Sequence, residues 1–132
     1  MSLLLDTHAA IWYLHQSREI SRTALKTIRE AVSKGKPLYV SAISLVEAIY
    51  LVERGRIPLS AIMKLEGALK DPDSGLKVAP VDAEVAEAIY RIPRQNVPDM
   101  PDRIICATAL CRNLLLITKD ARIQTIGIKT IW

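Results

Sequence analysis

Four acidic residues stand where an α/β protein would place its chemistry. Asp6 directly follows the first apolar run of the chain, and Asp120 follows the last long one. Glu47 is expected in the first turn of the helix after the second predicted strand, and Asp102 at the start of the helix before the last run. Ligands of open α/β sheets bind beyond the carboxyl ends of the strands. The four carboxylates are therefore predicted to meet at one edge.

Carboxylates that converge repel one another, and several would have to take up protons to coexist. A hard divalent cation removes this conflict, because Mg²⁺ and Mn²⁺ prefer oxygen ligands. Such an ion also keeps several waters, which leaves positions for a substrate phosphate and an attacking water. The pattern therefore indicates metal-assisted hydrolysis in which the acids need not act as bases.

Helix capping is the competing interpretation for most of these acids. Ser44 and Glu47 have the spacing of a capping box, in which Glu47 reaches back to the Ser44 amide, and this is the preferred interpretation for Glu47 taken alone. Asp99 could cap the following helix while Asp102 complements the helix dipole from its first turn. Asp120 could cap a short helix. Only the joint pattern favours a shared site.

The elements that must position these acids alternate along the chain. Short apolar runs without polar alternation are typical of strands buried in a parallel sheet, and helical patterns separate them. This order predicts one domain over residues 1–132, a three-layer α/β/α sandwich around a mostly parallel sheet of four or five strands. The predicted strands are Leu3–Leu5, Leu38–Val40, Lys77–Ala79, Leu114–Ile117 and Ile128–Trp132, and the predicted helices are Thr7–His15, Ser21–Ser33, Ser44–Arg54, Ser60–Lys70, Asp82–Arg91 and Pro101–Arg112.

Composition narrows the class of protein. Half of the 132 residues are apolar, which excludes disorder, and the apolar runs are too short to span a bilayer. We expect a cytoplasmic protein without a disulfide, since Cys106 and Cys111 are spaced for different faces of a helix. The net charge is +4, and setting aside the four candidate acids leaves 18 basic against 10 acidic residues, or +8. This balance is compatible with a nucleic-acid partner.

Four segments carry a family resemblance that runs from residue 2 to about residue 132. They are Leu4 to His8 with Ile11 and Trp12, Ser41 to Glu47, Asp99 to Ala109, and Leu115 to Asp120. In this order they resemble the motifs of PIN-domain ribonucleases, most closely the VapC-type toxins of bacterial VapBC toxin-antitoxin pairs.

The resemblance implies an endoribonuclease that hydrolyses RNA and leaves a 5′-phosphate and a 3′-hydroxyl. The resemblance also implies a Mg²⁺ site, with Mn²⁺ as a possible substitute. The residues at the matching motif positions, which would hold the ion, are Asp6, Glu47, Asp102 and Asp120. Thr118 matches a hydroxyl position that supports the site. Asp99 stands three residues before Asp102, so the two acids could exchange duties, with Asp102 expected as the principal ligand.

The resemblance also implies partners. These are RNA as substrate, a VapB-type antitoxin whose C-terminal segment lies along a groove beside the site, and a homodimer that could sit within a toxin-antitoxin hetero-oligomer. Two other classes remain open at this point. One is a non-catalytic α/β binding module. The other is an aspartate-phosphorylating phosphatase or receiver-like domain, although Asp6-Thr7-His8 departs from the Asp-x-Asp that such a phosphatase needs.

Several flanking side chains are weaker candidates. His8 could touch a phosphate, although a partly exposed polar role is preferred. Trp12 could stack on a base or belong to a helix-packing surface. Ser41 and Thr7 could bond to the acids, but backbone capping is preferred for both. The candidate basic contacts to RNA are Arg54, Arg56, Arg103, Lys119 and Arg122, of which Arg54 and Arg56 are assigned to surface solvation.

Overall fold

The strand Leu3–Leu5 (β1) forms the middle of the sheet, and all three of its side chains are buried. A computed structural model describes the whole chain, residues 1–132. The five strands run in the order β3-β2-β1-β4-β5, and all four pairings are parallel. The other strands are Leu38–Ser41 (β2), Leu76–Ala79 (β3), Leu115–Ile117 (β4) and Thr130–Ile131 (β5). The predicted mostly parallel sheet of four or five strands is confirmed, with five strands and no antiparallel pairing.

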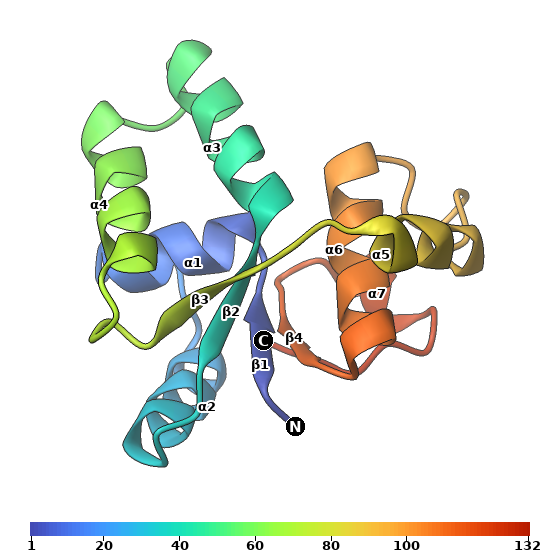
Figure 1. The fold of residues 1–132 in the computed structure, drawn as a ribbon, viewed down its shortest axis with the longest axis horizontal. Helices are drawn as coiled ribbons and strands as arrows, with labels where there is room; N and C mark the ends of the chain where they lie inside the picture. The colour runs from blue at the N-terminus through green and yellow to red at the C-terminus, as the bar shows by residue number, and fades with distance from the viewer.

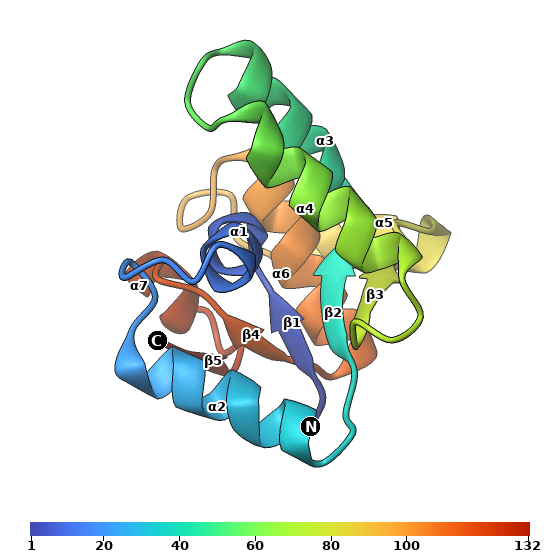
Figure 2. The ribbon, with the colours of Figure 1, turned by 90° about the vertical axis from the view of Figure 1, so that its left-hand side faces the viewer.

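Helices cover both faces of this sheet. Figures 1 and 2 show α1, α2 and α4 on one side and α5, α6 and α7 on the other, while α3 and α4 project past the carboxyl end of β2. None of the helices has the length and apolar character needed to cross a membrane. The helices are α1 (Thr7–Leu14), α2 (Arg22–Ser33), α3 (Ala42–Glu53), α4 (Leu59–Lys70), α5 (Ala83–Ala88), the 3-10 turn η1 (Ile89–Arg91), α6 (Met100–Arg112) and α7 (Ala121–Gln124).

Strand alternation divides the apolar core into two clusters. Leu3 and Leu5 of β1 pack with α1, α2 and α4, whereas Leu4 between them packs with α5 and α6. Neighbouring residues of a strand point to opposite faces, so three consecutive leucines can serve both layers. This arrangement confirms the predicted three-layer sandwich.

The helix after β2 begins earlier than predicted. Ser41 is its N-cap, and the Ser41 hydroxyl accepts a hydrogen bond from the Ile43 amide at 3.2 Å. Ser44 lies inside the first turn, with its side chain fully buried. The predicted capping box between Ser44 and Glu47 is therefore wrong, and Glu47 lies in the second turn rather than the first. The preferred capping role of Ser41 is confirmed.

One buried and one exposed leucine of α4 provide a test of the core. Leu65 is fully buried in the cluster on the α1 side, whereas Leu59 is 62% exposed. We expect Leu65→Ala to lower the free energy of unfolding by about 2 to 5 kcal/mol, because it removes apolar contacts and leaves a cavity. Leu59→Ala should change it by less than about 0.5 kcal/mol. Urea denaturation of both variants measures the difference, and equal losses would contradict the packing described here.

Candidate active site

Adjacent parallel strands bring Asp6 and Thr118 together. Leu5 of β1 is in register with Ile117 of β4, and the Asp6 amide donates to the Ile117 carbonyl at 3.1 Å. Asp6 is the residue after β1 and Thr118 is the residue after β4. Both therefore lie at the carboxyl edge, as the sequence predicts, and Thr118 is fully buried there.

The Asp6 carboxylate is both a helix cap and a member of this edge. Its Oδ1 accepts a hydrogen bond from the Ala9 amide at 2.9 Å at the start of α1. Burial raises the pKa of Asp6 above its ordinary value, while hydrogen bonding by Thr118 and Ala9 and the nearby charge of His8 lower it, and the Glu47 charge raises it further. The rise in pKa means that the charged form of Asp6 is under strain without a cation.

A buried hydroxyl chain orients Glu47. The Thr7 hydroxyl oxygen lies 2.5 Å from Glu47 Oε1 and 2.9 Å from the Ser44 hydroxyl oxygen. A threonine hydroxyl has one proton, so Thr7 donates to the carboxylate and accepts from Ser44. The preferred capping role of Thr7 is therefore wrong. Its hydroxyl fixes a candidate ligand instead, a role that depends on the contact between α1 and α3.

Asp102 shows most clearly that the acids meet. It lies in the first turn of α6, and its pKa is raised to about 6, first by burial and then by the charges of Glu47, Asp99, Asp120 and Asp6. These carboxylates come from four separate parts of the chain. Their combined effect on one side chain places them around a common space.

Cys106 lies one turn further along α6, beneath the same space. Burial, followed by the charges of Asp102, Asp120 and Asp6, raises the pKa of its thiol to about 12. Cys106 is a buried free thiol, and Cys111 is also unpaired. The expected absence of a disulfide between them agrees with the structure, and Cys106 stays protonated at neutral pH.

Asp120 is held by Arg122, two residues further along the chain. Its carboxylate accepts from the Arg122 amide at 3.0 Å and forms an ion pair with the Arg122 guanidinium at 2.8 Å. The hydrogen bond from the Arg122 side chain keeps the pKa of Asp120 below its usual range. Asp120 also caps α7, as the competing interpretation from the sequence predicted.

A cleft between α3 and α6 opens beside these acids. Its volume is about 480 Å³, and Glu47, Asp99 and Asp102 line it. Asp99 occupies the N-cap position of α6 but its side chain caps no amide, so its carboxylate is free of that role. The other lining residues are mostly apolar: Ile43, Val46, Tyr50, Leu51, Arg54, Met100 and Pro101.

The chemistry of the donors fits a hard divalent cation. All are carboxylate oxygens, and their charges add to burial in raising the pKa of Asp102. In the arrangement seen here, no three acidic, histidine or cysteine side chains lie close enough together to share one ion. Glu47 faces Thr7 and Asp120 faces Arg122. The Glu47 carboxylate has a second oxygen for an ion, and holding an ion jointly would require the acids to move closer together.

The candidate basic contacts are distributed differently from the prediction. Arg103 does not face the acids, because its guanidinium donates to the Ile89 and Ile92 carbonyls at 3.2 and 3.0 Å. Arg54 lies over the Tyr50 ring, at 5.9 Å from its centroid. Arg103 therefore has a structural role, which its sequence position beside Asp102 did not reveal.

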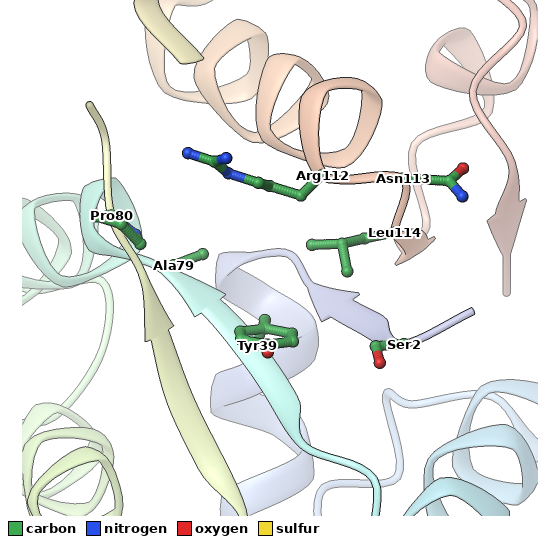
Figure 3. A pocket seen from close by; sticks show the side chains of 7 residues that line it. All are labelled: Ser2, Tyr39, Ala79, Pro80, Arg112, Asn113 and Leu114. Atoms are coloured by element: carbon green, nitrogen blue, oxygen red, sulfur yellow. The ribbon is translucent and has the colours of Figure 1, made fainter. Parts of the chain in front are cut away.

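A second cavity, of about 420 Å³, lies between the end of α6 and the sheet. Ser2 and Leu114 line it from before β1 and β4, and Ala79 and Pro80 line it from the end of β3. Figure 3 shows Arg112 extending over it from the end of α6. Arg112 is already paired with Asp82 and Glu84, and none of the predicted site residues lines the cavity. The candidate site remains the carboxyl edge.

A parallel α/β/α sandwich with acidic residues at its carboxyl edge can support metal-dependent hydrolysis of phosphodiesters. The sequence model of the PIN domain family matches residues 3–129, and the chain belongs to this family. Ribonuclease VapC22 of Mycobacterium tuberculosis (strain ATCC 25618 / H37Rv) is 30% identical over 124 residues, which cover 94% of this chain and 91% of the relative. The PIN-domain ribonuclease family and the VapC-type likeness predicted from the sequence are confirmed.

Solved structures support the same fold. VapBC2 from Rickettsia felis, bound to a DNA fragment from its promoter, contains a chain with a TM-score of 0.73 and 17% identity, covering 99% of this chain and 98% of that one. DNA-bound VapBC from Salmonella typhimurium gives a TM-score of 0.71 and 23% identity, with coverages of 99% and 97%. The PIN-like fold therefore holds across distant sequences.

The raised pKa of Asp102 predicts a pH-dependent stability of the metal-free protein. Between its ordinary value of 3.8 and about 6, the folded protein holds a proton on Asp102 that the unfolded chain has lost. The free energy of unfolding should therefore fall as pH rises through this window. The lowered pKa of Asp120 acts with the opposite sign and below 3.8, outside the window.

Asp102→Asn should remove this loss of unfolding free energy at higher pH. Urea midpoints in chelator are compared for wild type and variant at about pH 4 and about pH 7. We expect the urea midpoint of the variant to rise relative to that of wild type as pH rises. A difference between the two proteins that stays constant with pH would show that the pKa of Asp102 is not raised in the folded protein.

Proposed function

We propose that this protein is a divalent-metal-dependent endoribonuclease toxin, with Asp6, Glu47, Asp102 and Asp120 as the metal ligands. The observation that carries the proposal is the raised pKa of Asp102, which burial raises first and the charges of carboxylates from four segments raise further. Membership of the PIN domain family and likeness to a ribonuclease support the reaction class. No comparison favours the receiver-like, phosphatase or non-catalytic alternatives.

The chain's own residues prepare the site. When bound, Mg²⁺ or Mn²⁺ would polarise the scissile phosphate and lower the pKa of a water molecule. Thr7 holds Glu47 through a partly buried hydrogen bond, which limits the rotamers of that carboxylate. Thr118 lowers the pKa of Asp6 and so favours the charged form that a cation needs. Asp99 is a supporting acid at the mouth of the cleft.

The ion is proposed to be Mg²⁺, with Mn²⁺ able to replace it. The candidate ligands are all carboxylates, with no soft ligand among them, and such oxygen sites suit both ions. Cys106 lies below the acids, but its raised pKa keeps it a thiol and not a thiolate ligand.

The partners proposed are RNA, a VapB-type antitoxin and a second copy of the chain within a toxin-antitoxin assembly. The cleft between α3 and α6 suits a segment of the antitoxin. Its walls are largely apolar, and Glu47, Asp99 and Asp102 would attract a basic side chain of that segment. The structural relatives are VapBC complexes, some bound to DNA. A cytoplasmic location follows from this proposal, because cellular RNA is the substrate.

Divalent metal should stabilise the protein through Glu47. Binding relieves the repulsion among the acids, so Mg²⁺ or Mn²⁺ at 100 times its dissociation constant should add about 2.7 kcal/mol to the free energy of unfolding. Glu47→Gln should keep the bond to Thr7 and the metal-free Tm, yet weaken Mg²⁺ binding by about tenfold or more.

The control is Glu87→Gln, which changes an exposed glutamate on α5. Melting is measured in chelator and across a series of Mg²⁺ concentrations at matched ionic strength. Identical metal responses of wild type and Glu47→Gln would remove Glu47 from the proposed site.

RNA cleavage should depend on the two acids that follow β1 and β4. Asp6→Asn keeps an N-cap residue that bonds Ala9, so the fold should survive while cleavage falls severely. Asp120→Asn should behave likewise. The matched control, Asp73→Asn, alters an exposed aspartate of the loop before β3. Gel analysis of a labelled RNA with Mg²⁺ measures the rates, with circular dichroism as the check on folding. Wild-type cleavage by both site variants would refute the proposal.

A further inference from the structure

A group of aromatic and basic side chains adjoins the acidic edge. His8, Trp12, Lys119 and Trp132, which we call the Trp12 patch, come from α1, from the β4–α7 connection and from the residue after β5. The His8 and Trp12 rings are 5.4 Å apart between centroids, and the Trp12 and Trp132 rings are 5.7 Å apart. Lys119 Nζ lies 5.8 Å from the Trp12 ring centroid.

The topology places this patch directly beside the candidate metal ligands. His8 follows Asp6 by two residues, and Lys119 stands between Thr118 and Asp120. Trp132 follows β5, which pairs in parallel with β4, so it also lies at the carboxyl edge. None of the four patch residues belongs to the proposed ligand set.

The exposure of the patch suits a ligand. His8 and Lys119 are exposed, whereas Trp12 and Trp132 are only partly buried, with one side packed on the core cluster of the α1 layer. Core packing alone would account for the inner sides of the two indoles. It does not account for two exposed basic side chains gathered around them.

We propose that the Trp12 patch binds an unpaired nucleotide of single-stranded RNA, which would lead the strand to the acidic edge. The proposal rests on the proposed function. Every base presents a π-face that can stack on an indole, Lys119 offers positive charge to an adjoining phosphate, and His8 offers a hydrogen bond. The acids repel a phosphate chain, so attraction must come from the border of the site. The patch supplies it through Lys119, the residue directly before Asp120.

Intrinsic fluorescence tests the patch directly. The chain has two tryptophans, Trp12 and Trp132, and both belong to the patch, so all indole emission comes from it. Wild-type protein in chelator is titrated with an unstructured RNA of about eight nucleotides, a length typical of single-strand sites. We expect quenching by this RNA and weaker quenching by the same RNA annealed to its complement, whose bases are already stacked.

Variants separate stacking from packing. Trp12→Leu keeps an apolar side chain but removes the ring, and should weaken RNA binding by at least about fivefold, while Trp12→Phe should restore most of it. Lys119→Ala changes only an exposed side chain, so it tests the patch even where Trp12→Leu folds poorly. It should weaken binding several-fold and reduce the salt dependence.

Matched controls are exposed side chains that do not belong to the patch or to the proposed ligand set. Lys34→Ala, after α2, removes an exposed lysine, and Tyr90→Ala removes a ring that is 94% exposed on η1. Neither should change RNA binding. Absent quenching, equal quenching by duplex RNA, or wild-type affinity in both Trp12→Leu and Lys119→Ala would overturn the proposal.

Cleavage of the same RNA with Mg²⁺ is followed in parallel, so the two proposals can fail separately. Wild-type cleavage without quenching would overturn the patch and leave the ribonuclease assignment intact. Quenching and variant effects without cleavage by any divalent ion would support the patch and count against the ribonuclease assignment.

Discussion

Repulsion among carboxylates at one edge is the constraint around which this structure is organised. Parallel strands must end side by side, so acids that follow β1 and β4 are forced together with those of α3 and α6. Three of the acids have hydrogen-bond donors that stabilise their charged forms. Asp6 accepts from Ala9, Glu47 from Thr7 and Asp120 from Arg122. Asp102 has only causes that raise its pKa, and its pKa moves to about 6. Asp6 also keeps a raised pKa despite its hydrogen bonds, so the charged forms of Asp6 and Asp102 are the ones that a cation would favour most.

Two of these hydrogen-bonded carboxylates are also the N-caps of helices. Asp6 caps α1 and Asp120 caps α7 with the carboxylates proposed to hold metal. Removing either acid therefore tests two roles, which is why an amide that can still cap is the informative replacement. Glu47 is different, because its partner is the buried hydroxyl of Thr7 and not a backbone amide. Its position depends on packing between α1 and α3, so the site is coupled to the core more closely at Glu47 than at the two caps.

The sequence was sufficient for features that follow from chain order. The apolar run of β1, the parallel topology and the gathering of the acids need only the alternation of strands and helices. It was insufficient where two similar local patterns competed. Ser41 and Ser44 can both begin a helix, and only the burial of Ser44 against Thr7 decides between them. Arg103 likewise binds carbonyls of η1 and of the residue after it, partners far from it in sequence. Local spacing carries no information about such contacts.

An edge that repels phosphate cannot attract RNA by itself, so binding and chemistry must be divided between different residues. The acidic centre needs a cation before a phosphate can approach it, and the flanking basic residues can hold the strand nearby. Cation and RNA should therefore favour each other's binding, because each reduces the unfavourable charge that the other meets. A basic side chain of an antitoxin placed in the cleft would neutralise the same acids without supplying a reactive water. Inhibition and activation would then differ only in which positive charge fills the edge.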